Sequence, residues 1–354
     1  MTNDLKVTFP SGVVDYIFLP KDERKKNLFE HLAASYDRNH IVIVTNDHIA
    51  KLYEPLFKGY KMLVMPASER SKDLDTIGTL SRQLLEMGAG RNTLLIGVGG
   101  GVVTDITGFL ASVYMRGVAF GFVPTSLLGM VDAAIGGKNG VNMGLNKNLL
   151  GTITQPKFIL YDVRFLQTLP DVEWSNGFAE IIKYACIFDA QLFDELAGQH
   201  ISFYKQDDEA LRTLIEKCVA WKNNTVIADE RETGVRKLLN FGHTAAHAIE
   251  KLYEVPHGKA VAIGMMIACI ISERVADLDA EATERLKQIL HQYQLPVSMA
   301  INTAKAMDVL LMDKKRRDEL IDFIVLEKIG QGAIRSLPFD VVEKGLLAYS
   351  AIAR

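Results

Sequence analysis

The first half of the chain alternates short apolar runs with amphipathic stretches. The β-branched run at 40–45 predicts a buried strand, and the runs at 61–65 and 93–97 predict two more. Helical periodicity follows the first strand through Leu52-Tyr53 and is clearest over 73–87. Because strands and helices alternate, we expect a parallel sheet covered by helices, which is an α/β fold.

The pattern changes after Leu169-Pro170, where long stretches carry apolar residues at i, i+3 and i+4 and few segments look like strands. We therefore place a domain boundary at residue 170. The prediction is an α/β domain over residues 1–170 and an all-α domain over residues 171–354. The helical stretches predicted in the second domain are 177–196, 208–228, 242–253, 259–275 and 281–293.

Composition narrows the class of protein. The chain has 354 residues, of which 48% are apolar, and a net charge of −3. A disordered chain would need lower hydrophobicity and higher net charge, so we expect a globular protein. There is no basic excess to hold a nucleic-acid backbone, so we expect no nucleic-acid partner.

Cysteines and apolar runs bear on the compartment. Cys186, Cys218 and Cys269 are far apart in apolar surroundings, which predicts buried free thiols in a reducing compartment. The first residues lack the basic and apolar regions of a signal peptide. The longest apolar stretch, 261–271, has about half the length needed to span a bilayer. We expect a cytoplasmic protein with no membrane partner.

A glycine-rich run follows the third predicted strand and opens a helix. Gly97, Gly99, Gly100 and Gly101 let the backbone approach a pyrophosphate, whose charge is favoured by the amides at a helix N-terminus. The spacing departs from the G-x-G-x-x-G fingerprint, because Val102 stands where the last glycine would be. The run is a candidate nucleotide site, and the alternative is a tight strand-to-helix turn.

Polar residues are concentrated further on, where glycines, small hydroxyl residues, lysines and amides recur between buried apolar positions. This mixture suits an anionic, polyhydroxylated ligand, with amides and hydroxyls for alcohols and lysines for phosphate. The alternative is a polar surface loop with solvated lysines. The segments concerned are 114–117, 124–126, 131–132, 136–142 and 146–148.

Histidines are concentrated in the second half. His243 and His247 are four residues apart, on one face of a predicted helix, and His257 follows. Glu180 and Lys183 are polar positions in an otherwise apolar helix. Two imidazoles and a carboxylate with one open position make a catalytic zinc site. The alternative is that these histidines cap helices or lie on the surface.

Residues beside the first histidine limit the chemistry. Thr244 follows His243, so the H-E-x-x-H signature is absent and peptide hydrolysis is disfavoured. Arg236 and Asn240 precede it at helical spacing and add a cation and an amide, which a phosphorylated substrate would use.

Taken together, these motifs resemble the 3-dehydroquinate synthase family of sugar-phosphate cyclases. The resemblance covers about residues 40 to 330, in order and with the family's spacing. It is carried by Gly99–Asp105, Arg116-Gly117, Pro124-Thr125, Val131-Asp132, Gly136–Lys138, Lys147-Asn148, Thr168–Pro170, Ala179–Lys183, Leu239–Thr244 and His257-Gly258.

The resemblance implies an NAD-binding α/β domain, a helical domain and an active site in the cleft between them. It also implies a homodimer that uses NAD⁺ and one divalent metal, normally Zn²⁺ with Co²⁺ as an alternative. The substrate would be 3-deoxy-D-arabino-heptulosonate 7-phosphate, cyclised to 3-dehydroquinate with loss of phosphate in the shikimate pathway of aromatic amino acid biosynthesis.

The resemblance also assigns roles to residues. It implies Glu180, His243 and His257 as metal ligands. Around the carbocycle it places Asp132, Lys183, Lys222, Arg236 and Asn240. At the phosphate it places Lys138, Asn148, His247 and a lysine of Asp313-Lys314-Lys315, with Lys315 favoured, and Arg116 from the partner subunit. At NAD it places Glu69, Lys72, Gly99, Gly100, Gly101, Asp105, Thr125, Ser126, Lys147 and Thr168, and Asn46 at the adenosine ribose.

Two positions and one spacing depart from the family pattern, and the spacing is that of His243 and His257, which are only 14 positions apart, a short loop for the third metal ligand. Asn46 stands where the family usually has an aspartate, and the neighbouring Asp47 is the alternative. The glycine usual after the Asp-Lys-Lys motif is absent, so Lys314 remains an alternative to Lys315.

Three rival functions remain open. Another cyclase, of the amino-dehydroquinate or 2-deoxy-scyllo-inosose type, would use the same machinery, but Asn240 favours the dehydroquinate type, since the inosose enzymes have an acid there. A metal-dependent polyol dehydrogenase would release NADH, whereas a cyclase would not. A binding protein without activity is disfavoured, because every metal and lysine position of the family is present.

Overall fold

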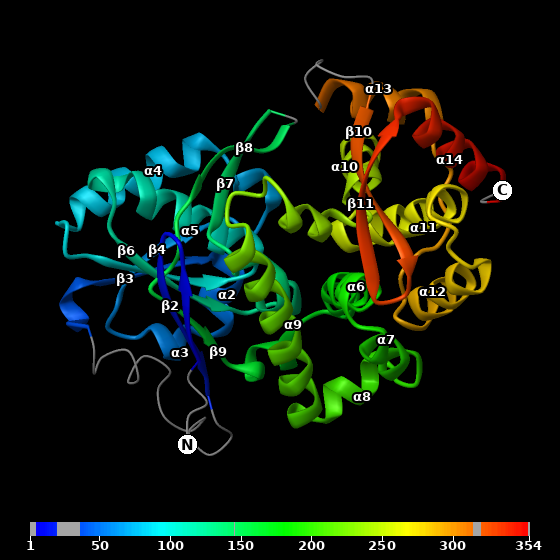
Figure 1. Cartoon of the computed structure of the whole chain (residues 1–354). Helices are drawn as coiled ribbons and strands as arrows, with labels where there is room; N and C mark the ends of the chain where they lie inside the picture. Colours follow the sequence, from blue (N-terminus) through cyan, green and yellow to red (C-terminus); the bar gives the residue numbers. More distant parts are fainter. Residues whose placement is uncertain (1–4, 20–35, 145, 314–319, 353–354) are drawn as a thin grey trace. The chain divides into compact units, whose positions relative to one another are not determined.

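A computed structural model describes residues 5–19, 36–144, 146–313 and 320–352. The chain divides into two compact units, Met1–Leu169 and Pro170–Arg354 (Figure 1). The division falls at the Leu169-Pro170 step, where the long helical stretches begin.

The described part of the first unit is built on a seven-stranded sheet of order β1-β2-β9-β6-β5-β3-β4. Every neighbouring pair is parallel except β1 and β2. Strand β5, which lies between β6 and β3, is buried at all its residues, as a parallel strand covered on both faces requires. The strands are β1 (Leu5–Phe9), β2 (Gly12–Phe18), β3 (Ile41–Asn46), β4 (Lys61–Met65), β5 (Leu94–Gly99), β6 (Ala119–Pro124) and β9 (Phe158–Tyr161).

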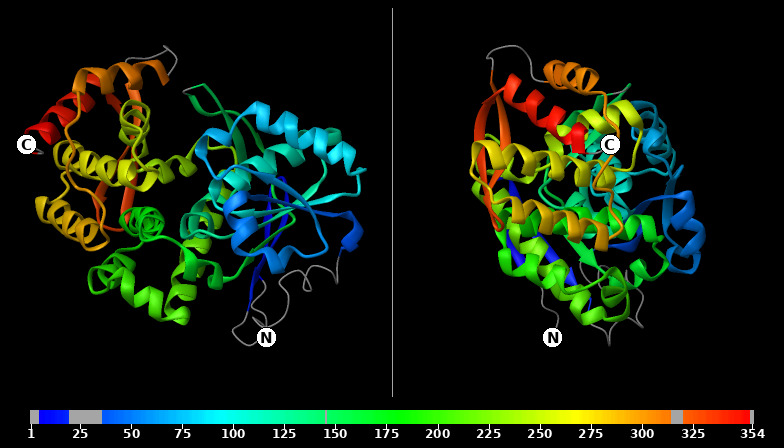
Figure 2. Two further views of the ribbon diagram at one scale, coloured as in Figure 1. Left: turned by 180° about the vertical axis from the view of Figure 1, so that it is seen from behind. Right: turned by 90° about the vertical axis from the view of Figure 1, so that its right-hand side faces the viewer.

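Helices cover both faces of this sheet. α4 and α5 lie on one face, and α2 and α3 lie on the other (Figures 1 and 2), as right-handed crossovers between parallel strands require. The helices are α2 (Asp47–Leu52), α3 (Glu54–Phe57), α4 (Leu74–Glu86) and α5 (Gly101–Val113). The short helical turns are η2 (Arg38–His40), η3 (Glu69–Ser71), η4 (Tyr114–Arg116), η5 (Gly129–Ala133) and η6 (Val163–Thr168).

A hairpin of β7 (Lys138–Met143) and β8 (Asn146–Ile153) packs on α5. The approach is close, since a Cβ at Gly108 of α5 would lie 1.8 Å from Asn139 Oδ1. The Asn139 side chain donates to the carbonyls of Gly137 and Thr154 and so holds the base of the hairpin.

The second unit is helical and is organised around α11. This helix packs against α6, α10, α12, α14 and a β-hairpin (Figure 2), and its buried residues run without interruption from Ala260 to Ser272. A helix that is apolar on all sides belongs inside a protein. The elements are α6 (Asp171–Phe188), α7 (Ala190–Ala197), α8 (Ile201–Gln206), α9 (Asp208–Ala228), η7 (Val235–Asn240), α10 (His243–Tyr253), α11 (His257–Val275), α12 (Ala280–Gln292), α13 (Thr303–Asp313) and α14 (Phe339–Ile352).

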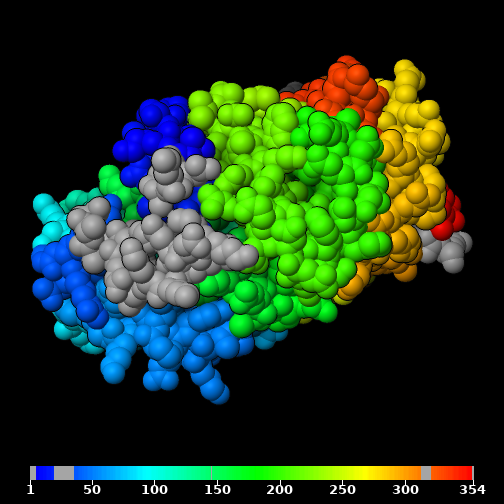
Figure 3. Space-filling view, turned by 90° about the horizontal axis from the view of Figure 1, so that it is seen from below, coloured from blue at the N-terminus to red at the C-terminus, as the bar shows by residue number. Residues whose placement is uncertain are grey.

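Helices α7, α8 and α9 form an outer surface of this unit (Figure 3, green). One side of each helix is therefore buried and the other exposed. In α8, for example, Ile201 and Tyr204 are buried and the residues between them are exposed. Exposed polar residues on one side and apolar residues on the other give these helices a single buried stripe.

The fold class is confirmed, with one addition. The strands predicted at 40–45, 61–65 and 93–97 are β3, β4 and β5, and the stretch predicted at 208–228 is α9. The second unit also contains the antiparallel hairpin of β10 (Leu320–Lys328) and β11 (Gln331–Pro338), so it is not purely α. The Leu326 N–H donates to Ser272 Oγ at 2.9 Å and ties this hairpin to α11.

Two further expectations concern the chain as a whole. Cys186, Cys218 and Cys269 are buried and free, as predicted. Across the described residues, every helix is too short or too polar to pass through a bilayer.

Candidate active site

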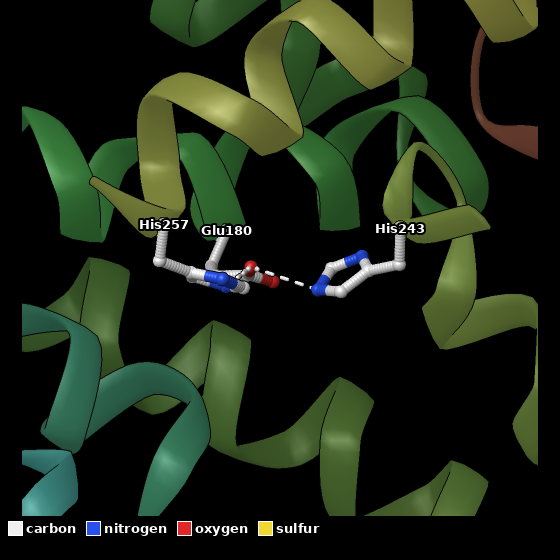
Figure 4. Close-up of side chains that lie close together, drawn as sticks. All are labelled: Glu180, His243 and His257. Carbon is white, nitrogen blue, oxygen red and sulfur yellow. Dashed lines mark hydrogen bonds and ion pairs between the residues drawn. The ribbon is translucent and has the colours of Figure 1, made fainter. Parts of the chain in front are cut away.

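Three side chains of the second unit point at one another. Glu180 comes from α6, and His243 and His257 are the first residues of α10 and α11 (Figure 4). Their ligand atoms lie within 4.8 Å of one another. Glu180 Oε1 lies 3.0 Å from His257 Nε2 and 3.4 Å from His243 Nε2. Two imidazole nitrogens and a carboxylate oxygen therefore converge on one small volume.

The second nitrogen of each imidazole has an acceptor of its own. His243 Nδ1 lies 3.2 Å from the Phe241 carbonyl, and His257 Nδ1 lies 3.3 Å from Glu250 Oε1. An Nδ1–H that donates to such an acceptor leaves Nε2 with a lone pair and fixes the plane of the ring. Both rings are thus oriented with Nε2 toward Glu180.

Glycines set the approach of these helices. Gly242 has a φ of +78°, and a Cβ there would lie 2.9 Å from the Met265 N and 3.0 Å from the Val261 O. A Cβ at Gly264 would lie 2.0 Å from the Gly242 carbonyl oxygen. Only glycine fits either position, so the glycine before His243 lets α10 begin directly against α11.

A buried ammonium group, that of Lys183, stabilises the ionised form of the Glu180 carboxylate. Glu180 is 0% exposed, and its Oε2 makes an ion pair with Lys183 Nζ one helical turn away. Burial alone would raise the pKa of Glu180, but the Lys183 ammonium and the two histidines outweigh it and hold that pKa well below its usual range. The carboxylate is therefore ionised, as a metal ligand must be.

The state of His257 depends on the same contacts. Burial alone would lower its pKa, but hydrogen bonds to Glu180 and Glu250, and the charges of both carboxylates, raise the pKa of His257 to about 10. A metal cation must displace the proton that this imidazole otherwise holds between two carboxylates. The donor set of two Nε2 atoms and one carboxylate is that of catalytic zinc sites, so the residues fit a divalent metal.

Other predicted site residues of the second unit lie near these ligands or are buried in the same unit. The His247 ring contacts the His243 ring edge to face, with centroids 5.8 Å apart. Lys183, Lys222 and Arg236 are all buried, which is rare for cations that have no function or partner. Arg236 Nη1 donates to the Glu230 carbonyl at 2.5 Å.

Asn240 ends η7, three residues before the first histidine. Its Nδ2 donates to Glu232 Oε1 at 2.6 Å. The sequence assigned no role to Glu232, which fixes the orientation of the Asn240 amide.

In the first unit, the glycine-rich run joins β5 to α5. Gly99 ends the strand, Gly100 is the N-cap without a side-chain cap, and Gly101 begins the helix. A helix that lacks a capping side chain presents its first N–H groups to a ligand. The strand-to-helix turn and the candidate nucleotide site are the same segment.

Residues predicted at NAD surround this turn. Lys72 is buried, and its ammonium makes an ion pair with Asp105 of α5. The Thr125 N–H donates to the Gly99 carbonyl at 3.0 Å, and Ser126 Oγ accepts from the Gly129 N–H at 3.1 Å. The first bond ties the end of β5 to the residue after β6 beside the helix N-terminus, and the second orders the turn that follows β6.

The remaining residues predicted to contact NAD lie at helix starts, at the end of a short helical turn or on a strand of the first unit. Asn46 is the N-cap of α2, with its Oδ1 accepting from the Ile49 N–H, and Asp47 Oδ1 accepts from the Ala67 N–H. Thr168 Oγ1 lies 2.6 Å from the Tyr53 hydroxyl. Glu69 begins η3, and Lys147 lies on β8, both exposed.

The substrate candidates of the first unit lie in and before the β7–β8 hairpin. Asp132 is in η5, Lys138 is the first residue of β7, and Asn148 is on β8 with a φ of +52°. Arg116 is exposed on η4, also with a positive φ, of +68°. Lys314 and Lys315 lie outside the described residues, so the choice between them stays open.

Sequence reasoning missed Glu250 as part of the site. It lies seven residues after His243 on the same helix, and seven residues before His257. The sequence offers one signal for Glu250, which is a carboxylate two helical turns after a candidate histidine ligand. Its contact with His257 could not be predicted, because it depends on how the chain turns between α10 and α11.

The chain matches known families over most of its length. Residues 62–176 match the family model described as 3-dehydroquinate synthase N-terminal, and residues 177–316 match 3-dehydroquinate synthase C-terminal. A 3-dehydroquinate synthase of Campylobacter concisus (strain 13826) is 41% identical over 315 residues, which cover 86% of this chain and 89% of that protein.

Solved structures share the fold. A 2-epi-5-epi-valiolone synthase from Streptomyces hygroscopicus subsp. jinggangensis 5008, with NAD⁺ and Zn²⁺ bound, has a TM-score of 0.85 at 28% identity, over 96% of this chain and 97% of that one. A 2-deoxy-scyllo-inosose synthase complexed with carbaglucose-6-phosphate, NAD⁺ and Co²⁺ also has a TM-score of 0.85, at 22% identity, over 98% of this chain and 100% of that one. The second likeness concerns the fold alone.

The fold, the carboxylate with two imidazoles and the matched family models place the chain in the class of dehydroquinate-synthase-like sugar-phosphate cyclases. Both halves of the chain match one family within that class, and so does the relative from Campylobacter. The chain belongs to the 3-dehydroquinate synthase family and is an enzyme.

Proposed function

We propose that this chain cyclises 3-deoxy-D-arabino-heptulosonate 7-phosphate to 3-dehydroquinate and releases phosphate, as a cytoplasmic homodimer that uses NAD⁺ and Zn²⁺. The observation that carries the proposal is the convergence of Glu180, His243 and His257 in a chain of this family. The relative that is 41% identical supports the reaction. In this proposal, the domain over residues 1–170 binds NAD⁺ and the domain over residues 171–354 binds the metal. Co²⁺ is the alternative metal.

The ligand residues make a suitable metal centre. When bound, the metal supplies Lewis-acid polarisation of a substrate hydroxyl, and NAD⁺ supplies a transient acceptor for hydride. Lys183 keeps Glu180 ionised, and the Phe241 carbonyl and Glu250 keep both Nε2 atoms directed toward it. The site is thus organised before any ligand arrives, which avoids a cost of rearrangement during the reaction.

Cations of the chain serve the anionic substrate. Lys183, Lys222 and Arg236 are buried cations, which stabilise negative charge more strongly there than in water. The Asn240 amide, fixed by Glu232, binds a hydroxyl of the carbocycle, and Asp132 binds another. Lys138, Asn148, His247 and Lys315, with Arg116 of the partner subunit, hold the phosphate group until it leaves.

The test is phosphate release from the heptulosonate phosphate, measured with and without NAD⁺ and with and without a chelator. We expect release only when NAD⁺ and metal are both present, with 3-dehydroquinate as the product and no accumulation of NADH, since the reaction leaves the cofactor oxidised. Release of NADH would instead indicate a polyol dehydrogenase. A different carbocyclic product, identified by NMR, would indicate one of the related cyclases.

A further inference from the structure

Asn142 lies at an irregularity of the β7–β8 hairpin. Val141 pairs with Leu150 and Met143 pairs with Asn146, so the residues at 147–149 stand opposite the single residue Asn142. A bulge of this kind breaks the ladder and redirects the residues within it. The bulge contains Lys147 and Asn148, which are candidates for NAD and for the phosphate respectively.

Asn142 makes three hydrogen bonds at this point. Its backbone N–H donates to the Lys72 carbonyl at 2.7 Å, and its Nδ2 donates to Glu69 Oε1 at 3.0 Å. Its Oδ1 accepts from the Asn148 N–H at 2.9 Å. Two bonds therefore go to the segment at 69–72, and the third goes to the opposite strand of the hairpin.

Each partner of Asn142 is itself a predicted ligand contact. Lys72 makes an ion pair with Asp105, one turn into the helix that follows the glycine-rich run. Asn148 has a φ of +52°, a conformation that is uncommon outside glycine, although asparagine adopts it more often than most residues, and that gains from support. The bond from its N–H to Asn142 Oδ1 supplies that support. A continuous set of contacts thus runs from α5 through Lys72 and Asn142 to Asn148.

We propose that Asn142 is a positioning residue that couples the NAD-binding segment at 69–72 to the phosphate-binding residue Asn148. The inference rests on the proposed function, because it takes the roles of these two segments from it. The residue type follows from the geometry, since one short side chain must donate to Glu69 and accept from Asn148 at once. Asparagine does both, whereas aspartate lacks the donor and leucine lacks both groups.

Coupling of this kind is reciprocal. A ligand that orders the segment at 69–72 also fixes Asn142, and so it favours the conformation of Asn148 that receives the phosphate. By the same linkage, phosphate at Asn148 favours NAD⁺. We expect inorganic phosphate to tighten NAD⁺ binding by about fivefold or more, within the usual range of such couplings.

Hydrogen exchange tests the coupling without turnover. In the wild-type protein, we expect saturating NAD⁺ to slow exchange both in peptides covering 99–106 and in peptides covering 146–153. In Asn142→Ala, protection at 99–106 should remain and the protection at 146–153 should be lost, because a contact of NAD⁺ with the Lys147 side chain does not by itself shield the backbone amides of the hairpin. Asn92→Asp, an exposed change in a loop of the same unit, should behave as wild type.

A paired substitution tests the bond to Glu69. Asn142→Asp sets two carboxylates against each other and should raise the Kd for NAD⁺ about tenfold by calorimetry, as like charges in contact are strongly disfavoured. In a Glu69→Gln background, the glutamine amide can donate to the new carboxylate, so adding Asn142→Asp should raise the Kd for NAD⁺ much less than it does in the wild-type background. Melting curves show whether the Asn142→Asp variants fold. If they do not, the exchange pattern of Asn142→Ala tests the coupling alone.

The outcomes separate the inference from the proposed function. Protection at 146–153 that persists in Asn142→Ala would overturn the coupling, and so would an equal cost of Asn142→Asp in both backgrounds. Wild-type protein in which NAD⁺ protects 99–106 but not 146–153 would overturn it as well. Absence of protection in both segments would contradict the NAD site itself, and with it the proposed function.

Discussion

At the scale of single residues, the candidate metal centre depends on what holds each ligand as well as on the ligand. Glu180 Oε1 faces both Nε2 atoms, and its other oxygen pairs with Lys183. The acceptors behind the rings are a backbone carbonyl for His243 and the Glu250 carboxylate for His257. Such contacts select the tautomer and the ring plane, so they bear on metal affinity.

Substitution of a ligand should remove the metal and the activity together. His243→Ala deletes one of the Nε2 donors, so we expect metal content and phosphate release to fall below about one-hundredth of wild type, more than a substitution behind a ligand costs. Elemental analysis and a phosphate assay measure both. His291→Ala, on the exposed end of α12, is the matched control. A His243→Ala protein that keeps its metal and its activity would show that His243 is not a ligand.

Glu250 gives a weaker and more specific prediction. Glu250→Gln keeps an acceptor near His257 Nδ1 but removes the charge, so metal affinity should fall about 10- to 100-fold. Competition with a chromogenic chelator measures the Kd. Glu254→Gln, exposed at the end of the same helix, should leave it unchanged. Equal affinities for wild type and Glu250→Gln would limit Glu250 to a role in packing.

At the scale of elements, the segments between helices position the polar residues. Asp229 is the C-cap residue that follows α9, and its carboxylate accepts from the backbone N–H groups of Thr233, Gly234 and Arg236. Burial alone would raise the pKa of Asp229, but these donors outweigh it and lower that pKa below its ordinary value. The carboxylate therefore shapes the loop that delivers Arg236 and Asn240.

Asp229→Asn should weaken this loop in a pH-dependent way. Because the folded pKa is lowered, the stabilisation is present above the unfolded value of about 3.9 and is lost as pH falls through the folded pKa. The melting temperature of the variant should be lower than wild type at neutral pH, and the gap should shrink below about pH 4. Asp308→Asn, exposed on α13, matches the charge change. A gap that is constant with pH would exclude this role.

The start of α5 gives a prediction for the cofactor. Gly100 has an ordinary extended backbone, and a Cβ there would lie 3.2 Å from Ser126 Oγ, a contact that a small shift relieves. Gly100→Ala should therefore fold, but its methyl group keeps a pyrophosphate from the backbone, so the Kd for NAD⁺ should rise about tenfold or more. Gly12→Ala, in open space in the same unit, is the control. Unchanged affinity would move the pyrophosphate away from this turn.

Elements differed in how far their sequences revealed them. α4 buries Ile77, Leu80 and Leu84 at helical spacing, and β5 is an uninterrupted apolar run, so the patterns predict both. The β10–β11 hairpin was missed, because its turn depends on Gly330 with a φ of +82° and its packing on Ser272 of a distant helix. Local periodicity carries no information on such partners.

At the scale of the whole molecule, the two units carry different sets of candidate contacts. The candidate ligands Glu180, His243 and His257 all belong to Pro170–Arg354, whereas the glycine-rich turn and its neighbours belong to Met1–Leu169. Each set is held by contacts within its own unit, such as the ion pair of Lys72 with Asp105 and that of Lys183 with Glu180.

Metal removal should therefore separate the two functions. Treatment of the whole protein with a chelator should reduce phosphate release to background, while the Kd for NAD⁺ stays within about twofold, since the predicted NAD contacts do not include the predicted metal ligands. Added Zn²⁺ should restore release, and added Co²⁺ should do so as well. Loss of NAD⁺ binding on chelation would show that the metal also supports the cofactor site.

The sequence by itself determined the fold class and the family, and it predicted the chemical types of the site. Periodic apolar positions report the elements, and motifs such as Leu239–Thr244 are local in the chain. Only the tertiary structure decided which atoms meet. Glu250, two turns after His243 on α10, contacts His257 at the start of α11, and Asn142 bonds to both Lys72 and Asn148. Such contacts depend on helix approach and strand register, which residues far apart in the sequence settle together.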